Sequence, residues 1–275
     1  MRYTAREPES NVNVTSTSPI REFLVLTGGL LGIVVGIYFL LGLSVDLIVP
    51  HISIGLESKM GAPFIQSLEG KEAGSEQEHY VQGLIESLQK RCARLPYQFK
   101  VHVHKASTIN ALAFPGGHIV VYTGLLEKVT SENELAFVLA HEMGHYAHRD
   151  HLRGFGRAIV LMTISALLFG SESGVSNMLA HGLNVTEMSF SREQETRADE
   201  FALEVLNCAY GHVAGATDFF EKIPKELDPG KFGHYFASHP QNRRRISHLE
   251  NLIRSRGLPL AGRQPLPETI RQTKN

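Results

Sequence analysis

The chain has 275 residues, with 27 basic and 28 acidic side chains and a formal net charge of −1. This length favours one domain of ordinary size plus appendages over two full domains. Because the charge is nearly balanced, the chain lacks the concentrated basic surface that nucleic-acid binding requires, and we expect no nucleic-acid partner.

The N-terminal region divides into a polar arm and an apolar segment. Residues 1–22 are rich in Pro, Ser, Thr and Asn, a composition typical of disorder. Residues 23–45 contain no charged side chain, and a helix of this length spans about 34 Å, more than the roughly 30 Å core of a bilayer. We therefore predict one transmembrane anchor within residues 23–49. A cleaved signal peptide would have a shorter apolar region, of about 7–15 residues.

Three glycines in this segment are spaced four residues apart. Gly28, Gly32 and Gly36 form a repeated GxxxG pattern, through which another membrane helix could approach closely. The alternative is that glycine is simply common in membrane helices. The pattern leaves both interpretations open.

Basic residues near the ends of the apolar segment predict its orientation. Arg2, Arg6 and Arg21 precede it, whereas Lys59 is the only Lys or Arg between residues 46 and 70. Since basic residues favour the cytoplasmic side, we expect the rest of the chain on the non-cytoplasmic side. In a bacterium that side is the periplasm.

The region after the anchor predicts a linker and then one folded domain. Residues 50–75 contain several Pro and Gly residues and predict a linker that lies along the membrane surface. The domain is expected to cover 76–257 and to begin with a helix. Alternating or apolar runs predict strands at 99–103, 109–114 and 118–123. Three strands among several helices predict a mostly helical α+β fold.

His141 and His145 are the residues from which a function can first be inferred. Their spacing places both imidazoles on one face of a helix, where both can bind one metal ion, for which zinc is favoured. Glu142 is placed to take a proton from a water at the metal, so the three residues form the HExxH motif of metallopeptidases. Ser131 and Glu134 form a capping box that supports the helix. The alternative is a chance match in a chain with 14 histidines.

A second segment supplies the further ligand that such a site needs. Glu195 and Asp199 are four residues apart in a predicted helix at 191–208 and share one of its faces. Two carboxylates repel unless one binds a cation and the other orients a ligand histidine. Without the HExxH motif, this segment would predict an ordinary solvated, charged face.

The remaining segments complete the expected layout. Residues 158–169 form an apolar run that is too short to span a bilayer, and we expect a buried or membrane-touching helix there. Residues 170–184 are rich in Ser and Gly and predict a loop, a candidate lid. Helices are predicted at 214–223 and 240–257, followed by a flexible tail at 258–275.

Four further residues could in principle carry ligand or redox chemistry. His148 and His151 lie one and two turns past the metal pair and are expected to be solvated rather than to bind the metal. Cys92 and Cys208 lack CxxC spacing, so they do not form a sulfur-based metal site. They could be free, or they could pair in an oxidising compartment.

Several motifs occur in one order along the chain. They comprise residues 110–117, 124–126, 131–136, the HExxH motif, 191–199 and 238–240. Together they resemble the membrane-associated zinc metallopeptidases, the family that includes HtpX and the type I CAAX prenyl protease. The resemblance covers roughly residues 76–256 and implies a zincin-like domain of gluzincin type with one zinc ion per chain. By position it implies His141, His145 and Glu195 as zinc ligands, Glu142 as general base and Asp199 as the partner of a ligand histidine.

The same resemblance implies roles for two residues near the C-terminus. His239 matches a histidine that lies near the metal, where it could bind zinc or donate a hydrogen bond to the oxyanion. Alternatively, it lies at the surface and only precedes a helix-starting proline. Arg245 could pair with the acidic cluster at Glu195 and Asp199.

The resemblance also implies a substrate-binding strand and an activity. In zinc peptidases of this shape an edge strand beside the active helix binds an extended substrate, which here implies Ala111, Leu112 and Ala113, unless the strand is fully paired within its sheet. We expect a membrane-anchored zinc endopeptidase, similar to the single-span, quality-control members of the family. The alternative is a zinc-bearing chaperone-like or peptide-binding module with a plugged, weakly active site. Glu142 disfavours this alternative, because a structural zinc usually has four protein ligands and needs no base.

Overall fold

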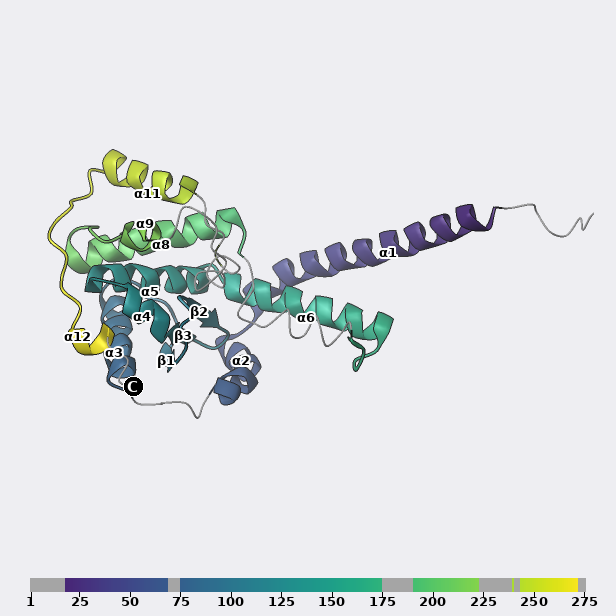
Figure 1. Ribbon diagram of the computed structural model, residues 1–275, viewed down its shortest axis with the longest axis horizontal. Coiled ribbons are helices and arrows are strands. Elements are labelled where there is room, and N and C mark those ends of the chain that lie inside the picture. The colour runs from purple at the N-terminus through teal and green to yellow at the C-terminus, as the bar shows by residue number, and fades with distance from the viewer. Residues whose placement is uncertain (1–17, 69–74, 175–189, 223–238, 240–242, 272–275) are drawn as a thin grey trace, which may run out of the picture.

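An apolar helix, α1 (Pro19–Ile48), projects from a body of helices that surrounds a small sheet (Figure 1). The computed structural model describes residues 18–68, 75–174, 190–222, 239 and 243–271. No residue of α1 is buried, and large apolar side chains are exposed along it. Within the described residues, α1 with its short extension and α6 (Asp150–Phe169) are the two helices long and apolar enough to cross a membrane.

The second of these helices, α6, is longer than its apolar run predicted. α6 begins at Asp150. The residue before it, Arg149, has a left-handed φ of 56°, which separates α6 from the helix that precedes it. α6 contacts α1, and Asp46 near the end of α1 lies 3.0 Å from Arg157 and 3.4 Å from Arg153. Most of the predicted loop at 170–184 lies outside the described residues.

The segment predicted as a linker contains two helical elements. A short 3-10 helix, η1 (Val49–His51), follows α1, and the helix α2 (Ile54–Leu68) follows η1. Val49 and Glu57 in this segment are buried. Pro50, Gly55, Gly61 and Pro63, which contributed to the linker prediction, lie within these helical elements. The described part of the segment packs against the body rather than only connecting it to α1.

The three predicted strands form one mixed sheet. They are β1 (Lys100–His104), β2 (Ala111–Phe114) and β3 (His118–Tyr122), in the order β1-β3-β2. β1 runs parallel to β3, and β2 pairs with β3 as an antiparallel hairpin. Gly116 and Gly117 form its turn with φ values of 96° and 88°, which favour glycine. The expected mostly helical α+β fold with a small sheet is confirmed.

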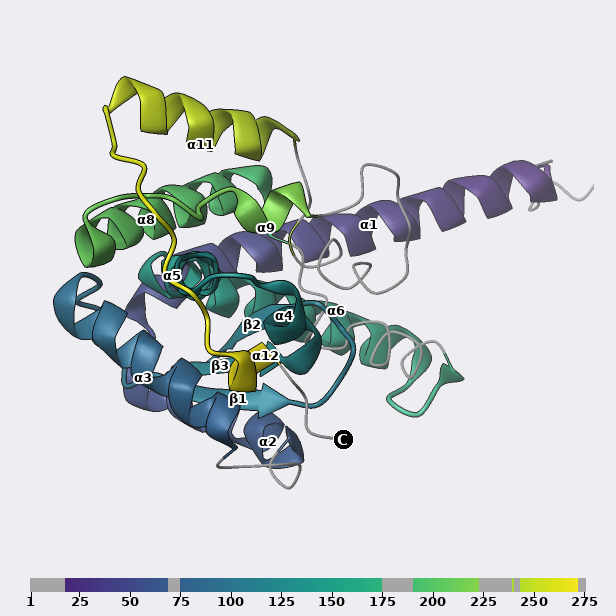
Figure 2. The same ribbon diagram turned by 60° about the vertical axis from the view of Figure 1, so that its left-hand side comes forward.

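The core consists of helices stacked on this sheet. α5 (Glu132–Ala147) lies between the sheet and α8 (Arg192–Tyr210), with α3 (Glu76–Arg91) at its side (Figure 2). Every residue of α5 from Asn133 to Tyr146 is buried. α5 and α8 approach so closely that a Cβ at Gly144 would lie 2.8 Å from Ala198 Cα. The short helix α4 (Thr123–Lys128) connects β3 to this layer.

The C-terminal part differs from its prediction in two places. The helix predicted at 214–223 is reduced to α9 (Asp218–Glu221), which follows Gly215 at a φ of 101°. The predicted flexible tail is wrong, because Pro265 bridges to Ser131 and Leu266 and Ile270 are buried, the latter in α12 (Glu268–Arg271). α11 (Arg243–Ser255) packs outside α8, in the place predicted for the last helix.

The two cysteines, whose state the sequence left open, form a disulfide. Cys92 and Cys208 have Cα atoms 5.8 Å apart and are separated by 116 residues. The bond joins the ends of α3 and α8. It therefore links the start of the folded body to the helix that carries the acidic segment.

Candidate metal centre

The helix α5 places two histidines and a glutamate in the interior. The side chain of Ser131 accepts a hydrogen bond from the Glu134 backbone and begins the helix. From this start the four-residue spacing brings His141 and His145 to one face, directed at α8, with their Nε2 atoms 3.1 Å apart. Glu142 is buried beside them.

The helix α8 brings two carboxylates to the same place. Its capping box, formed by Ser191 and Gln194, sets the start of the helix. Glu195 Oε1 lies 3.5 Å from His145 Nε2, and its Oε2 lies 3.5 Å from His141 Nε2. Asp199, one turn later, lies 2.9 Å from His141 Nδ1. Glu195 thus faces both imidazoles, while Asp199 contacts the opposite nitrogen of one ring.

His239 lies inside this cluster rather than at the surface. Its side chain is 0% exposed. Its Nδ1 atom lies 3.3 Å from His141 Nε2 and 3.0 Å from Glu195 Oε1, and its Nε2 atom lies 3.5 Å from Glu142 Oε1. The residue therefore stands between the acidic segment and the glutamate of the HExxH motif.

The spacing of these atoms fits a metal ion. One ligand atom from each of His141, His145, Glu195 and His239 lies within 4.8 Å of every other. Five separations between these residues, measured to one or the other oxygen of Glu195, range from 3.0 to 3.5 Å. Ligand atoms bound to one zinc ion at about 2.0–2.1 Å in a tetrahedral site lie about 3.3 Å apart. Three imidazoles and one carboxylate are a donor set suited to a divalent transition metal.

Arg245 on α11 pairs with the two carboxylates, as the sequence suggested it could. Its Nε and Nη2 atoms each donate to Asp199 at 2.7 Å, and Nη1 forms an ion pair with Glu195. For Glu195, His239 and Arg245 outweigh the effect of burial and hold the pKa well below its usual range. For Asp199, Arg245 and His141 outweigh burial and lower the pKa in the same way. Both acids are therefore ionised near neutral pH, as metal ligation and histidine orientation require.

Sequence reasoning missed two neighbours of His145. Asp150 Oδ2 lies 3.4 Å from His145 Nδ1, and Asp150 Oδ1 accepts a hydrogen bond of 2.9 Å from Gln194. The ring of Phe190 stacks on that of His145 with centroids 3.7 Å apart. Asp150 follows the motif by five residues, a spacing that gives no helical signal because the chain turns between α5 and α6. Phe190 precedes the cap of α8 and carries no pattern at all.

Burial and hydrogen bonds shift the pKa values of the three motif residues differently. Burial lowers the pKa of His141 to about 4, so this imidazole is neutral and able to bind a cation at pH 7. For His145, burial is outweighed by Asp150 and Glu195, which raise the pKa to about 9. Burial raises the pKa of Glu142 above its ordinary value. A base with a raised pKa is better suited to accept a proton near neutral pH.

The strand β2 borders the cluster. It lies at the edge of the described sheet, paired with β3, and it contacts α5. The Ala113 N–H donates to the Glu142 carboxylate, while Glu142 Oε2 is buried with no hydrogen-bond partner among the described residues. Ala111, Leu112 and Ala113 are all buried. The strand expected to bind substrate is thus in contact with the expected base.

The two histidines beyond the motif differ from each other. His148 is partly exposed, and its Nδ1 lies 2.9 Å from the Gly144 carbonyl. The expectation that His151 is solvated is wrong: it is 0% exposed, and its Nε2 lies 2.8 Å from Glu57 Oε1. The cause is α2, which the sequence did not predict and which covers this histidine.

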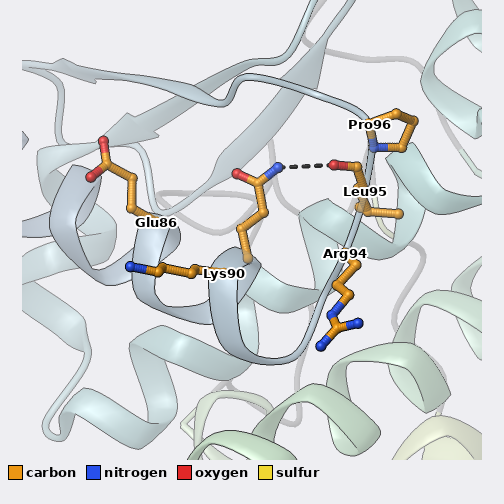
Figure 3. A pocket seen from close by; sticks show the side chains of 6 residues that line it. Glu86, Lys90, Arg94, Leu95 and Pro96 are labelled. Atoms are coloured by element: carbon orange, nitrogen blue, oxygen red, sulfur yellow. Dashed lines mark hydrogen bonds between the residues drawn. The ribbon is translucent and has the colours of Figure 1, made fainter.

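A surface hollow elsewhere in the chain shares no residue with the cluster. It lies at the end of α3, has a volume of about 590 Å³, and is shown in Figure 3. Its lining comprises Glu86, Gln89, Lys90, Arg94, Leu95 and Pro96. Gln89 donates a hydrogen bond of 3.1 Å to the Leu95 carbonyl. The hollow holds no group that would take part in chemistry at the cluster.

Comparison with known proteins gives one family and several relatives. Residues 75–253 match the family described as peptidase family M48. The chain is 30% identical over 169 residues to metalloprotease LoiP of Escherichia coli, covering 59% of this chain and 65% of that protein. It is 32% identical over 153 residues to mitochondrial metalloendopeptidase OMA1 of Arabidopsis thaliana, covering 55% and 31%. It is 27% identical over 219 residues to the beta-barrel assembly-enhancing protease of Escherichia coli, covering 73% and 44%. The chain thus spans less than two thirds of the length of each.

Proposed function

This chain belongs to peptidase family M48, and on that premise we propose that it is a zinc-dependent endopeptidase anchored to a membrane by α1. The observation that carries the proposal is the cluster of ligand atoms from His141, His145, Glu195 and His239 within 4.8 Å of one another, next to the buried Glu142. A metal-activated water and an adjacent carboxylate are the parts that peptide hydrolysis needs.

In this proposal His141, His145 and Glu195 hold one zinc ion. When bound, zinc supplies a Lewis acid that lowers the pKa of water to about 7 and polarises the peptide carbonyl. Asp199 fixes the ring of His141 through the 2.9 Å contact with Nδ1. Arg245 neutralises the remaining charge of the two acids, so that they can stay close together while buried.

Glu142 is the proposed general base. Its Oε2 atom, buried and without a hydrogen-bond partner in the described part of the chain, can accept the proton of the attacking water. The Ala113 N–H holds the carboxylate in position. Glu142 would then give the proton to the leaving amine, so that one carboxylate serves both proton transfers.

The strand β2 is the proposed site for an extended peptide. It lies at the edge of the described sheet, and the Ala113 N–H faces Glu142. Pairing with backbone groups at Ala111, Leu112 and Ala113 would place a scissile bond near the base and require little of the substrate side chains. This suits unfolded proteins as substrates, and we propose a role in protein quality control.

A second candidate function is favoured by the position of His239. Catalytic zinc sites usually have three protein ligands and an open position, whereas structural sites have four. His239 Nδ1 lies among the other ligand atoms, so the cluster has four protein donors. A zinc-bearing chaperone-like or peptide-binding module with a plugged site remains the alternative, and opening by movement of His239 would convert it into a peptidase.

The location we propose is a membrane, with the folded body on the non-cytoplasmic side. The Arg residues before the apolar segment of α1 support this orientation, and the Cys92–Cys208 disulfide fits an oxidising compartment such as the bacterial periplasm. Labelling an engineered surface cysteine on intact spheroplasts tests it. Protection of the body until the membrane is lysed would reverse the orientation.

Some expected divisions of the chain stay proposals. These are the anchor at 23–49 and the peptidase domain at 76–257. The boundary of the arm expected at 1–22 is corrected by α1, which already begins at Pro19, and residues 1–17 lie outside the described residues. Association of α1 with another helix through Gly28, Gly32 and Gly36 is likewise a proposal. Among the described residues, no atom lies within 4 Å of a Cβ built on any of the three.

The decisive experiment compares the wild-type chain with Glu142→Gln in a casein or self-cleavage assay, with the zinc content of both measured. We expect equal zinc content and a loss of hydrolysis of about 10²–10⁴-fold in the variant. If both bind zinc and neither cleaves any substrate tried, the binding-module alternative is favoured.

The ligand assignment is tested on α8 itself. Glu195→Gln should lose zinc, whereas Glu193→Gln should retain it, because the Glu193 side chain is 83% exposed and pairs only with Arg197 among the described residues. Full zinc occupancy and activity in Glu195→Gln would show that another acid completes the site.

A further inference from the structure

Glu57 is a buried acid that neither the motif nor the family match includes. It lies on α2, before the matched residues 75–253, and its side chain is 0% exposed. Its pKa is held below the ordinary value, because His151 and two hydrogen-bond donors outweigh the effect of burial. Burying a carboxylate costs free energy unless it is paired and hydrogen-bonded. The partners of Glu57 therefore show which parts of the fold this residue connects.

The partners of Glu57 come from three different parts of the fold. Its Oε1 atom accepts a hydrogen bond of 3.0 Å from the Gly116 N–H and lies 2.8 Å from His151 Nε2. Its Oε2 atom accepts a hydrogen bond of 3.0 Å from the Tyr97 hydroxyl. Gly116 lies in the turn that ends β2, and His151 Nδ1 lies 3.3 Å from the carbonyl of His145. One carboxylate therefore contacts both the hairpin and the region behind the metal cluster.

Close packing of α2 on the same turn is an independent observation. A Cβ built on Gly61 would lie 1.9 Å from the Pro115 carbonyl oxygen, and one on Gly116 would lie 2.9 Å from Ser58 Cα. No side chain fits between helix and turn at these positions. α2 is thus in direct contact with the end of the hairpin.

The aromatic neighbours connect these contacts to α5. Tyr146 on α5 donates through its hydroxyl to the carbonyls of Phe114 and His118, the latter at 2.7 Å. The rings of Tyr97 and His151, both held by Glu57, lie 4.9 and 4.2 Å from the ring of Tyr146. A displacement of Glu57 would therefore shift Tyr97 and His151 and, through their contacts, Tyr146, whose hydroxyl holds the end of β2 against α5.

We propose that Glu57 is a positioning residue for peptide hydrolysis, which holds the β2–β3 turn at a fixed place relative to α5. The proposal rests on the function proposed above, and it makes the segment after the membrane anchor part of the active-site framework. Arg149, at the junction of α5 and α6, donates to the carbonyls of Val49 and Ile52 at 2.8 and 2.6 Å and ties the same segment to the end of α5.

The test uses the full-length chain in detergent, with Glu57→Ala, Glu57→Gln and the control Lys59→Gln, an exposed position on the same helix. We expect Glu57→Ala to raise KM for an extended peptide about tenfold, because β2, the strand proposed to pair with the peptide, is displaced. Glu57→Gln should stay within about threefold of the wild type, because its amide oxygen still accepts from Gly116 or Tyr97. Zinc content should be equal in all four proteins.

Two outcomes distinguish positioning from a purely structural role. Loss of stability alone would lower the active fraction and leave KM unchanged, and this result would overturn the proposal. Hydrogen exchange gives a readout that needs no activity. The backbone amides of residues 111–114 and 116–118 should exchange at least about tenfold faster in Glu57→Ala and at the wild-type rate in Lys59→Gln. If the wild type cleaves no peptide, the proposed function fails while the exchange result still decides the positioning.

A further variant keeps the test decisive if Glu57→Ala does not fold. Tyr97→Phe removes one hydrogen bond to Oε2 and retains the ring. We expect exchange of the same amides to rise about threefold. Unchanged exchange in Tyr97→Phe, together with a wild-type KM in the same variant, would refute the role of this network.

Discussion

Asp199→Asn is the change whose effect on metal binding can be worked out most directly. Asp199 Oδ1 lies 2.9 Å from His141 Nδ1, within hydrogen-bond distance, and both of its oxygens accept from Arg245 at 2.7 Å. The negative charge of Asp199 fixes the orientation of the His141 ring and makes this histidine a stronger metal ligand. Asn has the same shape as Asp and lacks this charge. Loss of such a partner weakens metal binding by about 10–100-fold, which is about 1.4–2.8 kcal/mol.

The assay is zinc competition with a chromophoric chelator, with Asp150→Asn and Glu200→Gln as comparisons. Asp150 lies 3.4 Å from His145 Nδ1, a longer and therefore weaker contact than the 2.9 Å between Asp199 and His141, so Asp150→Asn should weaken binding less than Asp199→Asn. Glu200 pairs with His248 on the outer side of α8, and Glu200→Gln should leave affinity unchanged. Equal affinities of Asp199→Asn and Glu200→Gln would refute the reasoning. The unfolding free energy of metal-free Asp199→Asn should fall by about 1–3 kcal/mol, because Arg245 loses the charge of one of the two carboxylates with which it pairs.

Three further predictions concern other parts of the chain. His239→Ala should raise peptidase turnover and weaken zinc binding, because it removes the fourth donor of the cluster; a fall in kcat of about a hundredfold or more with zinc retained would instead indicate an oxyanion donor. The folded-state pKa of Glu57 lies below 4.5, so its contribution to stability should be complete above about pH 4.5 and lost as pH falls through the folded pKa. Thermal unfolding of wild type and Glu57→Gln from pH 7 to 3 checks this, and parallel curves would contradict it. Replacing Cys92 and Cys208 by Ser should lower the unfolding free energy by about 2–5 kcal/mol, because the disulfide closes a loop of 116 residues; an unchanged denaturant midpoint would show that it contributes nothing.

Local patterns in the sequence were enough to predict the elements that carry the cluster. The capping residue Ser131 and the four-residue spacing of His141 and His145 act within a few turns of one helix, so no distant contact was needed to place them. The same holds for Glu195 and Asp199 on α8 and for the alternation that predicted the three strands. The place of His239 came only from a resemblance, because a single histidine before a proline carries no physical signal of its own.

Other features were decided by contacts between segments far apart in the chain. His151 is 94 residues from Glu57, and Gln194 is 44 residues from Asp150. Periodicity describes which face of a helix a residue occupies, and it contains no information about which other element covers that face. His151 is therefore buried because α2 covers it. The sequence did not predict α2, since its Pro63 and two glycines are typical of a linker.

The C-terminal tail shows the same limit. Its three prolines predicted a flexible segment, yet Leu266 and Ile270 are buried and Pro265 bridges to Ser131 at the start of the metal helix. Proline disfavours the interior of helices and of central strands, but it does not prevent an extended chain from packing apolar side chains onto a surface formed elsewhere. The sequence alone determined the local chemistry of the HExxH helix and its acidic partner. The tertiary structure decided which distant side chains surround them, because burial depends on surfaces that exist only once the chain has folded.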